Sequence, residues 1–133
     1  MSELRLEIPM LPPSGNHYKT YKIIISRDPR QKAFAQWYLT PEAEAFYQCV
    51  SMVAGGRRVL GRQLEVTYIV FLPKLGGSDT DNYSKCIWDS LKHAGVIEDD
   101  RYIDDGHQHR RRDPLNPRTV IIVRSNQAQL EGI

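Results

Sequence analysis

The chain has 133 residues, of which 41% are hydrophobic and 26% are charged, a composition typical of one globular domain. A chain of this length buries roughly two-thirds of its unfolded surface, so it needs neither a metal nor a disulfide simply to fold. Its two cysteines, Cys49 and Cys86, exclude a disulfide-rich scaffold and a four-cysteine zinc site. The charged start MSELRLEIPM is unlike a signal peptide and no apolar run is long enough to span a membrane, so we expect a cytoplasmic protein.

The charges are distributed unevenly along the chain. Eighteen bases and sixteen acids give a net charge of +2. Residues 79–105 hold eight of the acids and three of the bases, which makes this stretch −5 and the rest of the chain +7. An acidic island in an otherwise basic chain is therefore the feature that a function has to explain.

The N-terminal third predicts one strand followed by irregular structure. Residues 4–8 alternate apolar and polar side chains, as a half-buried strand does. The turn-rich segment LPPSGN, residues 11–16, follows it. Residues 17–32 are basic and polar with a break at Asp28-Pro29, and we expect them to form a flexible loop.

The middle of the chain predicts a helix and then a buried strand. Thr40 is a good N-cap, Pro41 suits the first helical position, and apolar residues then recur at helical spacing until Gly55-Gly56. Residues 65–72, EVTYIVFL, are rich in β-branched and aromatic types and are typical of a buried strand.

The last part of the chain predicts a second helix and two more strands. The helix covers residues 82–94, with Gly95 just after its end. Strands are expected over residues 102–110 and 119–124, and residues 125–133 form a loose tail. The order β-α-β-α-β-β predicts an α+β fold: one small mixed sheet with two helices, in a single domain over residues 1–124.

Carboxylates gather around the second helix. Asp79 and Asp81 lie where a strand gives way to that helix, and their spacing in extended backbone points both side chains the same way. Lys85 lies about one helical turn beyond Asp81. Asp99 and Asp100 follow the helix, after a second apolar stretch. These residue types predict a site that holds a divalent cation.

Oxygen ligands without histidine or thiolate at matching spacing favour Mg²⁺, or Mn²⁺ in its place, over zinc. Divalent ions held by carboxylates commonly catalyse phosphodiester hydrolysis, because they activate water and neutralise charge on the phosphate and the leaving oxygen. A purely structural interpretation competes with this one. The aspartates before the helix could be caps, Asp81 and Lys85 a surface pair, and Asp99-Asp100 a solvated turn. A calcium-binding EF-hand is excluded, because Tyr83 and Ser84 stand where that loop needs an acidic or amide residue and a glycine.

Three blocks of this sequence resemble the RusA family of Holliday junction resolvases. LPPSGNHY, residues 11–18, is similar to the family's early Pro-Pro-Ser-x-Asn segment. DTDNYSKCIWDSL, residues 79–91, is similar to its Asp-x-Asp-Asn-x-x-Lys pattern and the helix that follows, which contains Asp and Leu. AGVIEDDRYID, residues 94–104, is similar to its Gly, apolar pair and Asp-Asp pattern. The blocks occur in the family's order and span nearly the whole chain.

The resemblance implies a homodimeric, Mg²⁺-dependent endonuclease that cuts four-way DNA junctions symmetrically in recombination and repair. It implies that the essential acids and metal ligands are Asp79, Asp81 and Asp100, with Asp99 the alternative to Asp100. The essential lysine corresponds to Lys85, which would stabilise developing negative charge or orient Asp81. Such a protein would associate with the nucleoid through DNA.

The sequence departs from the family before the Asp-x-Asp motif. Some members have an arginine-rich run there, whereas this chain has Lys74 as the one charge in residues 74–78. DNA-backbone contacts are therefore expected from other bases, among which solvated charge is the competing interpretation. The expected DNA-binding residues are Arg110, Arg111, Arg112, Lys19, Lys22 and Lys74.

Other candidate ligands have simpler interpretations. His107 and His109 share one face of a predicted strand, but two ligands fall short of the three or four of a zinc site. Cys49 and Cys86 lie in predicted helices and are expected to be core thiols. Asn16 fits turn chemistry. Two other functions stay open: a branched-DNA-binding protein without catalysis, and a metal-dependent phosphohydrolase acting on a small phosphorylated molecule.

Overall fold

Four strands of the described residues form one mixed sheet. The computed structural model describes residues 2–13, 19–25, 27–75 and 82–126. In this part of the chain the strand order is β1-β6-β4-β5, with β6 antiparallel to both of its neighbours and β4 parallel to β5. The strand bounds are β1 (Glu3–Ile8), β4 (Leu64–Leu72), β5 (Ile103–Arg112) and β6 (Arg118–Ser125).

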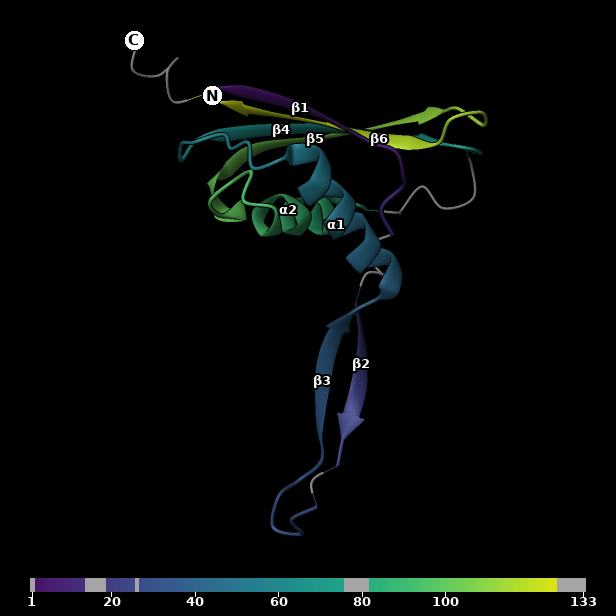
Figure 1. Cartoon of the computed structure of the whole chain (residues 1–133), viewed down its shortest axis with the longest axis vertical. Helices are drawn as coiled ribbons and strands as arrows, with labels where there is room; N and C mark the ends of the chain where they lie inside the picture. The colour runs from purple at the N-terminus through teal and green to yellow at the C-terminus, as the bar shows by residue number, and fades with distance from the viewer. Residues whose placement is uncertain (1, 14–18, 26, 76–81, 127–133) are drawn as a thin grey trace.

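Two helices cover one face of this sheet (Figure 1). α1 (Pro41–Ala54) starts as predicted, because the Thr40 hydroxyl accepts a hydrogen bond from the Ala43 backbone N–H at 3.3 Å. It ends at Gly55, whose φ of 57° is left-handed backbone. α2 (Ser84–His93) and the short 3₁₀ turn η1 (Asp100–Tyr102) lie between β4 and β5 in the chain. They form the crossover that a parallel strand pair requires.

The core lies between the sheet and the helices. Alternate residues of β1 and β4 point toward the helices and are buried, which is the period-two pattern of a sheet with one covered face. Fully buried side chains from both layers meet there, including Leu6, Phe46, Val50, Tyr68 and Ile121. Neither described helix is long and apolar enough to cross a membrane.

The predicted α+β class, with two helices and a mixed sheet, is confirmed. The predicted flexible loop over residues 17–32 is wrong. β2 (Lys19–Ile24) and β3 (Phe34–Leu39) form an antiparallel hairpin, which extends away from the sheet as a separate two-stranded arm (Figure 1). The lysines of β2 interrupt the alternation of apolar and polar residues that predicts a strand. Of the predicted tail, residues 127–133 lie outside the described residues.

β5 packs closely on α2 at Gly106. A Cβ built on Gly106 would lie 2.8 Å from Cζ2 of Trp88, closer than real contacts allow. The Trp88 ring also meets the buried Tyr68 ring edge-on at 5.5 Å. The absence of a side chain at Gly106 thus lets the Trp88 indole pack directly against the strand.

We expect Gly106→Ala to lower the free energy of unfolding by about 1–3 kcal/mol, because the new methyl group overpacks the Trp88 ring. Urea unfolding of both proteins measures the change. His107→Ala, at the next position and on the opposite face of β5, is the matched control and should stay within about 0.5 kcal/mol of the parent. Adding Trp88→Phe should cost less in the Gly106→Ala protein than in the parent. An unchanged stability of Gly106→Ala would contradict this packing.

Candidate active site

A hydrogen-bond network joins the start of α2 to the two central parallel strands. The Tyr68 hydroxyl lies 2.6 Å from the Ser84 hydroxyl and is hydrogen-bonded to Gln108 of β5. With the Gln108 amide nitrogen toward Tyr68, its oxygen accepts hydrogen bonds from Nε and Nη2 of Arg110, both at 3.2 Å. The Arg110 guanidinium also lies 6.0 Å from the centre of the Tyr83 ring. Arg110 is thereby held beside the first turn of α2.

Tyr68 is the buried anchor of this network. Burial raises the pKa of its hydroxyl, while the Ser84 hydrogen bond and the charge of Arg110 act in the opposite direction. The hydroxyl is therefore neutral at physiological pH and can both donate and accept. Removing the Ser84 or Gln108 side chain would take a hydrogen bond from the hydroxyl of buried Tyr68, which is costly away from water.

The strand register brings the basic end of β5 to the edge from which the Asp-x-Asp segment departs. Leu72, the last residue of β4, pairs with Arg112, and Val70 pairs with Arg110. Strand alternation places Arg110 on the helix side and Arg111 on the opposite face. Lys74 follows β4 and is exposed at the same edge. Three of the predicted DNA-binding bases, Arg110, Arg112 and Lys74, therefore gather at the point where the chain leaves the sheet.

The two aspartates of that motif, Asp79 and Asp81, lie outside the described residues, as does Asn16. The description resumes at Asn82, whose side-chain oxygen accepts a hydrogen bond from the Ser84 backbone N–H at 2.8 Å. This Asx turn leads the chain into α2. Lys85 then follows on the first turn of α2 with its side chain exposed.

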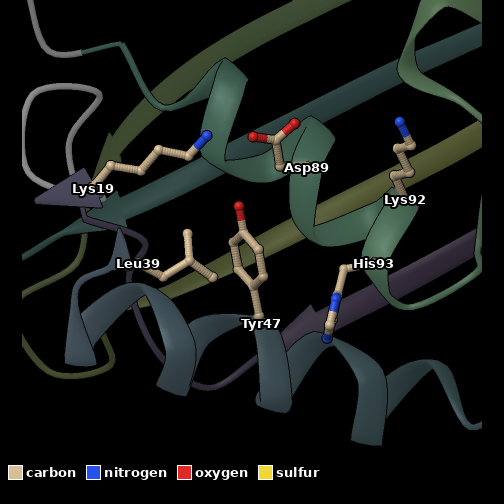
Figure 2. Close-up of a pocket in the computed structure, with 6 residues that line it drawn as sticks. All are labelled: Lys19, Leu39, Tyr47, Asp89, Lys92 and His93. Carbon is tan, nitrogen blue, oxygen red and sulfur yellow. The ribbon is translucent and has the colours of Figure 1, made fainter. Parts of the chain in front are cut away.

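Asp89 lines a cavity of about 490 Å³ between α2, α1 and the base of the arm. Figure 2 shows the Lys19 ammonium, the Tyr47 hydroxyl and the Asp89 carboxylate directed toward the same part of the cavity. Asp89 lies four residues after Lys85, one helical turn further along the same face. Sequence patterns alone did not assign Asp89 to the site. The available signal was the Asp of the helix inside the DTDNYSKCIWDSL block.

Asp99 and Asp100 differ in their surroundings. Asp99 caps η1 by accepting the Arg101 backbone N–H at 3.2 Å, and Lys92 Nζ lies 3.8 Å from it. The Arg101 N–H, together with a hydrogen bond from Asp100, lowers the pKa of Asp99. The pKa of Asp100 is raised, first by its hydrogen bond with Asp99, then by burial and by the negative charges of Asp99 and Asp89.

Asp100 therefore shares a hydrogen bond with Asp99 and lies beside the negative charges of Asp99 and Asp89. The donors in this part of the described chain are carboxylates, which suit a hard ion such as Mg²⁺. Among the described residues, no group of three or more histidine, cysteine or acidic side chains is close enough to hold a metal.

The two histidines of β5 lie on the face of the sheet opposite the helices. His107 Nε2 is 4.0 Å from Glu65 Oε1, and both His107 and His109 are exposed. Lys19 and Lys22 belong to the arm, not to the edge beside α2. Lys19 lines the cavity at the base of the arm, and Lys22 lies over the Tyr38 ring at 5.5 Å.

The family of this chain follows from a profile match. The family described as Endodeoxyribonuclease RusA matches residues 11–124 of the 133. No curated protein matches the chain significantly. The match covers every strand from β2 to β5, both helices and all but the end of β6. The chain belongs to the RusA endodeoxyribonuclease family, and so to a family of DNA-cutting hydrolases.

The cysteines lie where core thiols were predicted. Cys86 is buried in α2, and Cys49 is partly buried in α1. Burial, with a smaller effect of the Asp89 charge, raises the pKa of Cys86 to about 12. Burial also raises the pKa of Cys49. Both thiols are therefore protonated at neutral pH and poor nucleophiles.

We expect Cys86 to resist alkylation by iodoacetamide at neutral pH in the folded protein and to react readily in denaturing urea. Peptide mapping by mass spectrometry measures each cysteine separately, with Cys49 as the internal comparison. The unfolded thiol ionises near pH 9.0 and the folded one near 12, so the stability from keeping Cys86 neutral is complete below pH 9.0 and is lost as the pH rises toward 12. Equal labelling rates in native and unfolded protein would contradict this assignment.

Proposed function

We propose that this protein is an Mg²⁺-dependent endonuclease that resolves four-way DNA junctions by paired, symmetric phosphodiester hydrolysis in recombination and repair. The observation that carries the proposal is the family match over residues 11–124, which spans the Asp-x-Asp motif, Lys85 and the Asp-Asp pair. The placement of Arg110 beside the start of α2 supports it, because that motif immediately precedes α2.

The proposed metal ligands are Asp79, Asp81 and Asp100, with Mn²⁺ as a possible substitute for Mg²⁺. A bound divalent ion supplies positive charge that favours deprotonation of water and offsets charge on the phosphate. Asp99 is the weaker candidate ligand, because its carboxylate already caps η1 and interacts with Lys92 and Arg101.

The remaining groups act on the DNA phosphate. Arg110, fixed by Gln108 and Tyr83, presents a guanidinium whose planar donors match phosphate oxygens. Lys85, exposed on the first turn of α2, can approach the same phosphate as a point charge or orient Asp81. Arg111, Arg112 and Lys74 would hold the flanking backbone.

Symmetric cutting of a four-way junction needs two active sites related by a two-fold axis. A C₂ homodimer provides such a pair with one kind of chain. The proposed partners are therefore a second copy of this chain and junction DNA, and the proposed location is the cytoplasm, on the nucleoid.

Wild-type protein with Mg²⁺ should introduce paired nicks into a synthetic four-way junction, and Asp81→Asn should abolish them while junction binding persists. Loss of outer-shell groups around a metal typically costs about 10–100-fold, so loss of a direct ligand should cost more. Denaturing gels measure the nicks, and a mobility-shift assay with Ca²⁺ measures binding. Binding without cleavage under Mg²⁺ or Mn²⁺ would instead indicate a DNA-binding protein. Hydrolysis of nucleotides but not of junctions would indicate a small-molecule phosphohydrolase.

Arg110→Gln should slow cleavage of prebound junction by about 10–100-fold, the range expected when a hydrogen bond from a charged group is removed. Single-turnover cleavage after addition of Mg²⁺ measures the rate. Arg111→Gln, on the other face of β5, should alter affinity and salt dependence but not this rate. Arg5→Gln, an exposed arginine on β1, is the matched control and should behave as the parent. Equal cleavage rates for the three variants would remove Arg110 from the site.

A further inference from the structure

The β2–β3 arm has little support from the rest of the molecule. Apart from the pairing of its own strands, it contacts the body mainly where β3 leads into α1. Figure 1 shows both strands projecting well beyond the helices. Six residues of strand correspond to a reach of about 20 Å. A two-stranded hairpin alone in water is marginally stable, so we expect a binding partner to stabilise this arm.

One face of the arm is aromatic and apolar. Tyr21 pairs with Trp37, and Ile23 pairs with Ala35, so all four side chains share one face. The Tyr21 and Trp37 rings lie 5.2 Å apart at 55°. Their exposed fractions are 55% and 64%, and that of Ile23 is 58%. Large exposed apolar patches of this kind mark interaction surfaces.

The arm is also strongly basic. Residues 19–39 contain five bases and one acid, a charge of +4, whereas the remainder of the chain sums to −2. Three of the bases, Arg27, Arg30 and Lys32, lie around the tip. The single acid, Asp28, accepts the Arg30 backbone N–H at 2.9 Å and forms an ion pair with its side chain. The tip is thus a closed turn whose surface is dominated by positive charge.

The positive charge of the arm favours DNA over the arm of a second copy of this chain as the partner. Direct contact between the arms of two copies would bring like charges together, whereas DNA offers a continuous negative charge along its whole length. A two-stranded β-ribbon fits a DNA groove, and exposed aromatic rings stack on base faces where base stacking is interrupted. Both features of the arm, the basic tip and the aromatic face, therefore match a branched nucleic acid.

We propose that the β2–β3 arm is a second DNA-binding element, in which the basic tip binds phosphates and the Tyr21–Trp37 face stacks on bases exposed at the branch point. This inference rests on the proposed function for its substrate, branched DNA. It assigns recognition of the branch to a part of the chain separate from the proposed cleavage residues.

Junction and linear-duplex binding in Ca²⁺ test the arm without cleavage. Trp37→Ala should weaken junction binding by about 5–150-fold, which corresponds to the ~1–3 kcal/mol of one base stacked on an aromatic ring. It should leave duplex binding nearly unchanged. Trp37→Phe keeps a ring and should restore most of the junction affinity, which separates stacking from loss of arm structure. Leu115→Ala, at an exposed apolar residue between β5 and β6, is the control and should bind as the parent.

Substitutions that remove positive charge test whether the tip binds phosphates. The double variant Arg30→Gln, Lys32→Gln should weaken binding to both DNAs, because fewer phosphates are neutralised. The slope of log affinity against log salt should become shallower by about 0.9 for each phosphate that the tip no longer neutralises. Arg5→Gln should leave the slope unchanged. Unchanged junction affinity in Trp37→Ala and in the tip variant would overturn the proposal.

A different outcome would assign the arm to a protein partner. Sedimentation of each variant shows whether Trp37→Ala converts a dimer into monomers. If junction affinity falls only together with such dissociation, the arm is a dimer contact and the proposal is wrong. This test of the arm does not depend on catalysis. Wild-type protein that binds junctions through the arm but never cuts them would contradict the proposed function and would leave the proposal for the arm intact.

Discussion

The parallel pairing of β4 with β5 is the constraint on which the rest of the candidate site depends. A parallel pair cannot be joined by a tight turn, so α2 must cross the sheet between the two strands. The shared direction also brings the carboxyl ends of both strands to one edge, where Leu72 pairs with Arg112. The basic end of β5 and the departure point of the Asp-x-Asp segment are neighbours for this reason.

The same constraint sets the order of the polar residues along the crossover. Asp99 and Asp100 precede β5, at the end of the crossover, whereas Asn82 lies at its beginning. The ten residues of α2 between them correspond to about 15 Å of helix. Asp89, midway along α2, adds its negative charge to that of Asp99 in raising the pKa of Asp100. Asp89 and Lys92 of α2 therefore both act on the Asp99–Asp100 pair in the described chain.

Much of the fold could be predicted from local signals. The Thr40 cap, the glycine at the end of α1 and the apolar run of β4 each depend on nearby residues, and each prediction is confirmed. The arm was missed because an unpacked hairpin lacks the clean alternation of a strand with one buried face. Asp89 and the Tyr68–Gln108–Arg110 network were missed because they depend on contacts between elements far apart in the sequence, such as Tyr68 and Gln108, which are 40 positions apart. The assignment of Asp79, Asp81 and Lys85 to the site stays a prediction.

Because the arm is weakly attached, its sequence can evolve largely independently of the core. Its strands depend on each other, and no side chain of β2 or β3 is among the buried residues of the core. Local opening of such a unit costs much less than global unfolding, so its amides should exchange with solvent independently of the core. Insertions, deletions and charge changes in the arm would then leave the free energy of the core nearly intact. The arm is therefore the part of this molecule in which reach and selectivity can evolve without a cost to folding.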